Sequence, residues 1–161
     1  MSNCKITPSF VFPNNAEEVA KFYVSVFPDS RIIKTTTYKD DEPGPAGLVR
    51  TVSFELMGVH MIAANAVGDN FNFGQGLSIR VECDDQEMID SITKKLVAGG
   101  GKQEDCGWVV DRYGVSWQIN PRLVREVMDG KDDAKADRMI HALFQMKKLD
   151  VEKLQRAANG N

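Results

Sequence analysis

Residues 106–121, Cys-Gly-Trp-Val-Val-Asp-Arg-Tyr-Gly-Val-Ser-Trp-Gln-Ile-Asn-Pro, hold the side chains with the clearest chemical potential in this sequence. Residues 111–114 predict a tight turn, and residues 115–120 then alternate apolar and polar side chains, as a half-buried strand does. One face of such a strand belongs to a core. The other face offers hydrogen bonds but no charge, and it carries Ser116, Gln118 and Asn120. This polar face is therefore the first place to expect a functional site.

The elements that would position this strand occur twice along the chain. An Asx residue followed three positions later by Glu, a pattern typical of a helix start, comes after residues 9–12 and again after residues 78–81. Each predicted helix has an apolar stripe and ends at turn-forming residues, and residues 58–62 then align with residues 114–118. The pattern residues are Asn15, Glu18, Val19, Phe22, Tyr23 and Val26 in the first half, and Asp84, Glu87, Met88, Ile92 and Leu96 in the second.

This repeat predicts an α+β fold made of two tandem βαβββ modules, at about residues 4–66 and 75–121. Both modules would belong to one domain, residues 1–121. Residues 122–161 would form a C-terminal helical extension, because their apolar residues recur at helical spacing.

Within that plan, the remaining strands are expected at residues 32–38, 49–57 and 103–110. Residues 38–47, rich in Asp, Pro and Gly, predict an insertion loop in the first module. In the extension, residues 122–128 predict a short helix and residues 134–148 a second one. Asp150 is placed to cap a last helix that runs through Ala158.

Composition excludes several classes of protein. Asp and Glu outnumber Lys and Arg by 23 to 20, so nothing indicates a nucleic-acid surface. No apolar run is long enough to span a bilayer, and no signal peptide is apparent at the N-terminus, so we expect no membrane partner. Cys4, Cys83 and Cys106 form no Cys-x-x-Cys motif and cannot all pair, which predicts a reducing, cytoplasmic location.

Several segments resemble the PhnB-like family, often labelled demethylubiquinone methyltransferase-like, of the vicinal-oxygen-chelate superfamily. That superfamily includes glyoxalase I, extradiol dioxygenases and antibiotic-sequestering resistance proteins. The resemblance implies a glyoxalase-like curved mixed sheet built from the two modules, and a homodimer. The segments that carry it are residues 15–18 with Phe22 and Tyr23, residues 26–30, residues 81–86, residues 106–121, and the tail at residues 146–151 with Leu154 and Ala157.

The resemblance also locates the positions of metal ligands. In metal-dependent relatives each module supplies one ligand from its first strand and one from its last, and here these positions hold Ser9, Ile62, Ser78 and Gln118. Ile62 has no donor atom, and hydroxyls and a neutral amide bind divalent ions weakly. We therefore predict no bound metal and no cofactor. His60 has the same strand parity as Ile62, which favours a hydrogen-bonded residue of the cleft over a metal ligand.

The predicted ligand-binding cleft thus contains Ser9, His60, Ile62, Ser78, Arg80 and Gln118. Arg80 has two interpretations, either an ion pair with Glu82 at the rim or an anchor for an anionic ligand. Cys106 is interpreted as a structural thiol, because it has no neighbouring His and is preceded by two acidic residues. The turn at residues 13–15 lacks glycine, so we do not expect the methyltransferase label to describe the activity.

Three functions remain open for such a cleft. The preferred one is a metal-free, small-molecule-binding homodimer, in the manner of resistance proteins that sequester a drug between modules. The second is an enzyme that acts on an unknown small substrate through hydrogen-bonding side chains, and the third is an interaction dimer without a ligand. The absence of an evident acid–base pair favours binding over catalysis.

Overall fold

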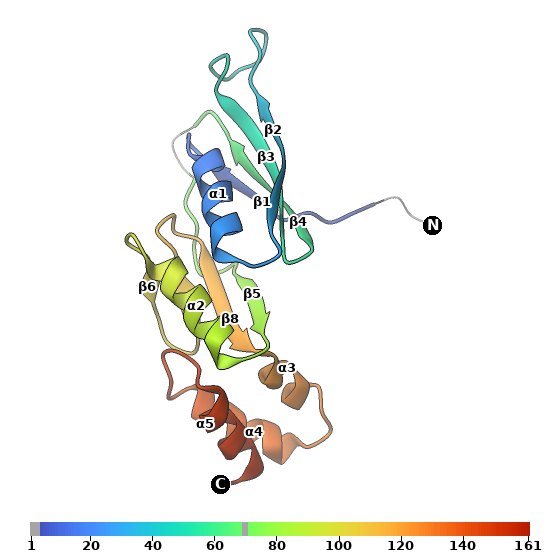
Figure 1. The fold of residues 1–161 in the computed structure, drawn as a ribbon, viewed down its shortest axis with the longest axis vertical. Helices are drawn as coiled ribbons and strands as arrows, with labels where there is room; N and C mark the ends of the chain where they lie inside the picture. Colours follow the sequence, from blue (N-terminus) through green and yellow to red (C-terminus); the bar gives the residue numbers. More distant parts are fainter. Residues whose placement is uncertain (1–3, 69–70) are drawn as a thin grey trace. The chain divides into compact units, whose positions relative to one another are not determined.

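The computed structural model describes residues 4–68 and 71–161, and the chain divides into two compact units, residues 1–72 and 73–161 (Figure 1). Each unit contains a four-stranded mixed sheet with one helix packed against one face. The predicted α+β fold with tandem βαβββ modules is therefore confirmed. Among the described residues, every helix is too short or too polar to span a bilayer.

Unit 1 has the order β1 (Ser9–Phe12), α1 (Ala16–Val26), β2 (Arg31–Thr37), β3 (Val49–Leu56) and β4 (Val59–Asn65). Its sheet runs β1-β4-β3-β2, with β1 and β4 parallel and the other pairs antiparallel. The apolar stripe of α1 packs on the alternate, apolar residues of the strands, as their period of two requires. This core contains Phe10, Val19, Tyr23, Phe54 and Met61, which are all buried.

The N-terminus of α1 departs from the predicted capping box. Asn15 is the N-cap residue, but its side chain makes no capping hydrogen bond, and its Oδ1 is buried without a partner among the described residues. Asn65 at the end of β4 takes over this role, because its Oδ1 accepts a hydrogen bond of 2.9 Å from the Ala16 N–H. The cap of α1 therefore comes from a residue distant in the sequence.

Unit 2 begins with β5 (Ile79–Cys83), α2 (Gln86–Val97), β6 (Lys102–Gln103), β7 (Trp108–Val110) and β8 (Ser116–Pro121). Its sheet runs β5-β8-β7-β6, and only β5 and β8 are parallel. The prediction of a single strand at residues 103–110 was wrong. Cys106 and Gly107 adopt φ angles of 59° and 79°, a left-handed conformation that interrupts the strand and leaves two short ones.

The start of α2 lies one residue later than the sequence pattern indicated. Asp85, not Asp84, is the N-cap, and its side chain accepts a hydrogen bond from the Met88 N–H at 2.8 Å. Asp84 instead forms an ion pair with Arg122. Only Asp84 satisfies the pattern of an Asx residue followed three positions later by Glu, but the backbone geometry makes the adjacent Asp85 the N-cap.

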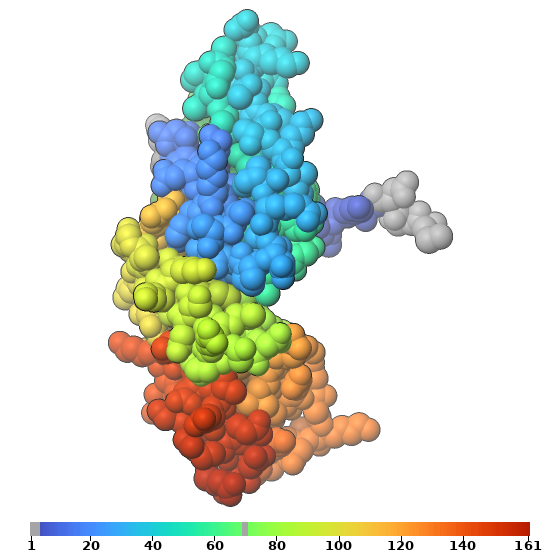
Figure 2. Space-filling model, viewed as in Figure 1, coloured from blue at the N-terminus to red at the C-terminus, as the bar shows by residue number. Residues whose placement is uncertain are grey.

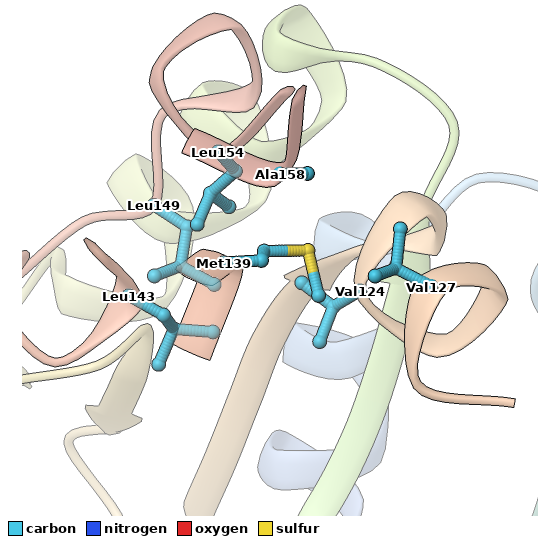
Figure 3. Close-up of a cluster of buried hydrophobic side chains, with 7 residues drawn as sticks. All are labelled: Val124, Val127, Met139, Leu143, Leu149, Leu154 and Ala158. Atoms are coloured by element: carbon cyan, nitrogen blue, oxygen red, sulfur yellow. The ribbon is translucent and has the colours of Figure 1, made fainter. Parts of the chain in front are cut away.

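Three helices complete unit 2, namely α3 (Arg122–Met128), α4 (Asp133–Leu143) and α5 (Val151–Asn159). The bounds of α3 are as predicted, and Asp150 caps α5 through a hydrogen bond from the Lys153 N–H at 2.9 Å. Helix α4 ends at Leu143, earlier than expected, because the chain turns there toward the β6–β7 segment. The helices enclose a small core of their own (Figure 3), formed by Val124, Val127, Met139, Leu143, Leu149, Leu154 and Ala158.

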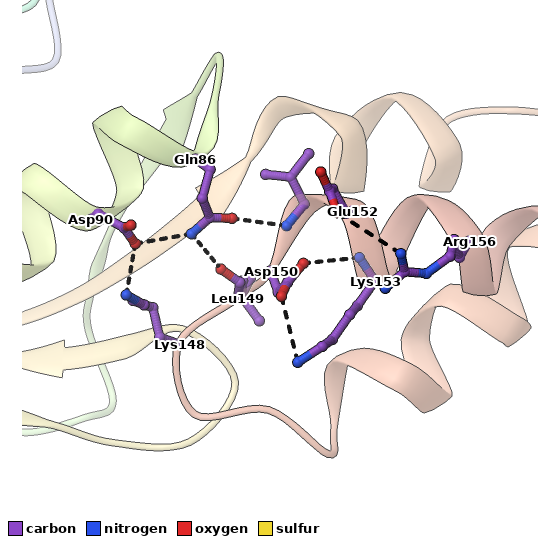
Figure 4. A network of polar contacts seen from close by, with 9 residues as sticks. Gln86, Asp90, Lys148, Leu149, Asp150, Glu152, Lys153 and Arg156 are labelled. Atoms are coloured by element: carbon purple, nitrogen blue, oxygen red, sulfur yellow. Dashed lines mark hydrogen bonds and ion pairs between the residues drawn. The ribbon is translucent and has the colours of Figure 1, made fainter.

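A polar network joins these helices to α2. The side chain of Gln86 donates to the Leu149 carbonyl at 3.2 Å and accepts from the Val151 N–H at 2.9 Å (Figure 4). Asp90, one turn further along α2, forms an ion pair of 2.7 Å with Lys148. The space-filling view shows the red surface of the C-terminal helices adjoining the yellow-green surface of α2 (Figure 2). The C-terminal helices are therefore an integral part of unit 2.

Candidate functional site

In unit 1, the face of the sheet away from α1 carries the predicted site residues. Ser9 and Ile62 are directly paired across the parallel β1–β4 ladder, and His60 lies two residues before Ile62 on the same face. Their neighbours Phe10 and Met61 point into the core and are buried, whereas Ser9 and His60 are exposed. The structure thus places Ser9, His60 and Ile62 together.

A pocket of about 240 Å³ lies on this face, and it is lined by Lys34, Thr36, Thr51, Ser53 and Ile62. Hydrogen bonds join its polar walls. The Thr36 and Thr51 hydroxyls are 2.7 Å apart, and His60 Nε2 lies 2.6 Å from Ser53 Oγ. Of the residues that line this pocket, only Ile62 was predicted from the sequence. The other four occupy alternate positions of two predicted strands, with the parity that places their side chains on the polar face.

The acid–base capacity of this pocket is limited by its surroundings. Glu55 stands directly opposite His60 in the β3–β4 ladder, but its carboxylate forms an ion pair with Arg31 at 3.1 Å. His60 bonds to Ser53 instead. The face therefore contains a serine–histidine pair, with the neighbouring carboxylate held by a guanidinium group.

In unit 2, the corresponding face lies away from α2. Gln118 on β8 donates a hydrogen bond of 2.8 Å to Ser78 Oγ, and Arg80 on β5 is its direct partner in the parallel ladder. Trp108 on β7 is paired with Gln118 from the other side, so Arg80, Gln118 and Trp108 form one row across three strands. Trp108 was not predicted as a site residue, because the strand break at residues 106–107 changes which face of the sheet its side chain lies on.

The two interpretations of Arg80 are separated by its neighbours. Glu82 accepts hydrogen bonds from Arg125 Nε at 3.0 and 2.8 Å, and the predicted pairing of Glu82 with Arg80 does not occur. Within the described ranges the guanidinium of Arg80 forms no hydrogen bond or ion pair, and the side chain is exposed. Ser116 and Asn120 are buried, so Gln118 is the accessible member of the polar face of β8.

Strand register relates the two units differently from the sequence repeat. The repeat matches Ser9 with Ser78, but the ladders pair Ser9 with Ile62 and Arg80 with Gln118. By register, Arg80 is therefore the counterpart of Ser9, and Ser78 reaches the same position only through its bond to Gln118. Both serines remain on the polar faces of their sheets.

The side chains at these positions do not fit a transition metal. Ile62 contributes no donor atom, Gln118 uses its amide nitrogen to bond Ser78, and Arg80 is a cation. In addition, no three His, Cys, Asp or Glu side chains of the described residues are grouped so that they could hold a metal ion. Strong ligation of a divalent ion requires imidazole, thiolate or carboxylate donors, which this set lacks.

Neither of two cysteines in unit 2 is positioned as a nucleophile. Burial, assisted by the nearby charges of Asp85 and Asp84, raises the pKa of the Cys83 thiol to about 12, so this group is protonated at neutral pH. Cys106 lies in the left-handed turn, where its N–H donates to the Met146 carbonyl at 2.7 Å. Its side chain packs against the core of the C-terminal helices. The geometry gives Cys106 a structural setting.

Two βαβββ sheets in tandem are the architecture of the vicinal-oxygen-chelate class, to which the comparisons also point. A family model described as 3-demethylubiquinone-9 3-methyltransferase matches residues 4–120, more than half of the chain, and the protein belongs to this family. A PhnB protein from Bacillus cereus is 34% identical, with a TM-score of 0.65, over 73% of this chain and 99% of that one. No match was found among curated proteins.

Two further solved structures share the fold at lower identity. Protein PA1353 from Pseudomonas aeruginosa is 20% identical, with a TM-score of 0.61, over 74% of this chain and 98% of that one. The fosfomycin resistance protein FosX from Mesorhizobium loti is 13% identical, with a TM-score of 0.59, over 81% of this chain and all of that one (100%). At these identities the likeness concerns the fold alone.

The family name implies a methyl donor such as S-adenosylmethionine, and the residues after β1 do not fit one. Residues 13–15 contain no glycine that would let a nucleotide-like group approach the backbone. The Ala16 N–H at the start of α1 is already bonded to Asn65. This helix N-terminus therefore lacks the open, glycine-lined cradle that such cofactors use.

Proposed function

We propose that this protein binds small molecules without a metal ion, in the pocket on the sheet face of unit 1 that lies away from α1 and, as a separate site, on the sheet face of unit 2 that lies away from α2. The observation that carries the proposal is the pocket of about 240 Å³ in unit 1, which includes Ile62 at a position where metal-dependent relatives place a ligand. The lining combines apolar surface, from Ile62 and from the carbon atoms of the Lys34 and threonine side chains, with hydroxyl groups and one ammonium group, so it suits a small ligand that has both an apolar part and a polar or charged group.

The charges on these faces favour an anionic group on the ligand. Lys34 lines the pocket in unit 1, and Arg80 on the polar face of unit 2 lacks a partner in the described part of the chain. A guanidinium group offers bidentate hydrogen bonds to carboxylate, phosphate or phosphonate. The fold likeness to FosX, a fosfomycin resistance protein by name, supports the small-molecule class without identifying the ligand.

Calorimetric titration tests this proposal directly. The purified protein would be titrated with small carboxylates, phosphonates and quinones, with and without a chelator. We expect binding that survives chelation, and a loss of about tenfold or more in affinity for the Lys34→Met or the Arg80→Met variant. Lys39→Met, in the loop after β2, is the matched control and should bind as the unmodified protein does.

Two results would contradict the proposal. One is a stoichiometric transition metal in the purified protein by elemental analysis, with binding abolished by a chelator. The other is unchanged binding in both the Lys34→Met and the Arg80→Met variants, which would place the ligand elsewhere.

A second candidate function is an enzyme that uses His60 as a general base. The contact of 2.6 Å between His60 Nε2 and Ser53 Oγ favours it, because a base must lie within hydrogen-bond reach of the proton it takes. Chemical conversion of a bound ligand, lost in both the Ser53→Ala and the His60→Gln variants, would support an enzyme. Binding without conversion would support the first proposal.

The resemblance further supports a homodimer as the assembled state. Light scattering on the purified protein at micromolar concentration tests this, and the mass of a monomer would contradict it. We propose that methyl transfer is not the activity, because the β1–α1 turn lacks the glycines of a nucleotide site. Binding of S-adenosylmethionine in calorimetry would overturn that statement.

A further inference from the structure

A second pocket, of about 400 Å³, lies within unit 2. It is formed where the β6–β7 turn meets the segment between α4 and α5, and its volume lies in the range of small-ligand sites. None of the positions predicted from the sequence belongs to it. Its lining residues are Gln75, Lys102, Gln103, Glu104, Asp105, Trp108 and Lys147.

Two of the four charged residues in this pocket neutralise each other. Glu104 accepts a hydrogen bond from Lys102 Nζ at 3.1 Å and another from the side-chain amide of Gln75. The carboxylate of Glu104 is thus already satisfied by donors of the protein. It contributes little further attraction for a ligand.

The other two charged residues have opposite signs and remain available. Asp105 and Lys147 are exposed, and neither side chain forms a hydrogen bond or ion pair within residues 4–68 and 71–161. Half-buried Trp108 lies in the same lining and provides an aromatic surface. The pocket therefore presents one free carboxylate, one free ammonium group and one indole ring.

Backbone hydrogen bonds join the two segments that carry these groups. The Cys106 and Gly107 N–H groups donate to the Met146 and Lys147 carbonyls, each at 2.7 Å, which ties Lys147 to the turn that contains Asp105. Gly107 has a φ of 79°, and a Cβ atom there would lie 2.8 Å from the Ile119 carbonyl oxygen. A side chain is therefore excluded at Gly107, and the turn packs closely against β8 and against Leu149, whose side chain would lie 3.0 Å from such a Cβ atom.

We propose that this pocket binds a small zwitterion, namely a free amino acid with an aromatic or apolar side chain. Its carboxylate would pair with Lys147, its ammonium group with Asp105, and its side chain would lie against Trp108. A simple anion would meet the negative charge of Asp105, and a simple cation would meet the positive charge of Lys147. A ligand that carries both charges satisfies both residues at once.

Calorimetry with three related probes tests the charge requirement. L-phenylalanine carries both charges, 3-phenylpropionate lacks the ammonium group, and phenethylamine lacks the carboxylate. We expect L-phenylalanine to bind at least about tenfold more tightly than either analogue. Equal affinities for the three probes, or no binding of L-phenylalanine, L-leucine or L-tryptophan at millimolar concentration, would overturn the proposal.

Variants locate the binding site. Lys147→Met should weaken L-phenylalanine about tenfold or more without weakening phenethylamine, and Asp105→Asn should weaken L-phenylalanine without weakening 3-phenylpropionate. Lys148→Met is the matched control, because the neighbouring Lys148 pairs with Asp90 and does not line this pocket. Thermal unfolding of each variant verifies that it is folded.

The same titrations separate this site from the one proposed above. Arg80→Met and Lys34→Met should leave amino-acid binding unchanged, since neither residue lines the pocket of unit 2. If Arg80→Met or Lys34→Met abolished the binding and Lys147→Met did not, the zwitterion would bind beside Arg80 or in the pocket of unit 1, and the assignment to this pocket would be wrong.

Discussion

The two units close the same hairpin in different ways. In unit 1, β3 and β4 are joined by a two-residue turn in which Met57 and Gly58 have φ angles of 49° and 83°. Positive φ at both central residues defines a type I′ turn, whose twist matches that of the strands it joins. This hairpin closes through local backbone geometry.

In unit 2, a buried carboxylate holds the corresponding hairpin between β7 and β8. Asp111 accepts hydrogen bonds from the Tyr113 N–H at 2.8 Å, the Val115 N–H at 3.1 Å and the Trp117 indole N–H at 2.8 Å. The turn is thereby tied to a side chain in the core. The strands it joins have only three and six residues, whereas those of unit 1 have eight and seven.

The helix caps of the two units differ in the sequence distance that they span. Helix α1 of unit 1 is capped by the distant Asn65, whereas α2 of unit 2 is capped by its adjacent Asp85. Both hairpins therefore close through contacts within the hairpin, by backbone geometry in unit 1 and by a buried carboxylate in unit 2, whereas the cap of α1 alone among these contacts depends on a distant residue. Equivalent positions in a repeated fold can therefore be stabilised by unrelated contacts.

The largest effect is expected for Asp111→Ala. This change leaves the Val115 N–H and the Trp117 indole N–H in the core without their acceptor, at a cost of about 3–5 kcal/mol in the free energy of unfolding. Hydrogen exchange resolved by peptide should place the loss in unit 2. Asp137→Ala on the surface of α4 is the control, and a loss below about 1 kcal/mol for Asp111→Ala would contradict the comparison.

Asn65→Ala should have the next largest effect. The carboxamide of Asn65 accepts from Ala16 and donates to the Val49 carbonyl at 2.8 Å, so its removal should cost about 2–3 kcal/mol. Faster exchange in α1 would be the signature. Asn15→Ala is the matched control and should cost little, because the Asn15 side chain makes no capping bond. A greater loss of stability for Asn15→Ala than for Asn65→Ala would indicate that Asn15, and not Asn65, caps α1.

Gly58→Ala should destabilise unit 1 by about 1–2 kcal/mol, because an L-residue at a φ of 83° is strained. A Cβ atom would meet nothing within 4 Å, so this backbone strain is the whole expected effect. Gly58→Asn should recover part of the loss, since Asn tolerates this conformation. Equal denaturation midpoints for the two variants would argue against a backbone origin.

Asp85→Ala should cost about 1 kcal/mol, the usual contribution of an N-cap. Its neighbour Asp84 provides the control, because an exposed ion pair such as that of Asp84 with Arg122 contributes little. Chemical denaturation of the two variants side by side distinguishes them. If Asp84→Ala were the more destabilising change, the helix would start where the sequence pattern placed it.

Much of the fold was predictable because it depends on short-range patterns. The alternation in residues 115–120 predicted β8, and the apolar periodicities predicted α1, α2 and α3. The strand break at residues 106–107 was not predictable in this way. It arises because the Met146 and Lys147 carbonyls accept the N–H groups of Cys106 and Gly107, which are distant in the sequence.

The candidate sites were likewise predictable only in part from the sequence. The resemblance and the internal repeat predicted Ser9, Ile62, Ser78 and Gln118 as positions of the cleft, and strand parity added His60 and Arg80, because side chains alternate along any strand. Tertiary structure decided which of them have partners: Gln118 bonds Ser78, Glu82 bonds Arg125, and Arg80 remains available. The pocket that joins Asp105 to Lys147 required a long-range backbone contact, and no local pattern encodes such a contact.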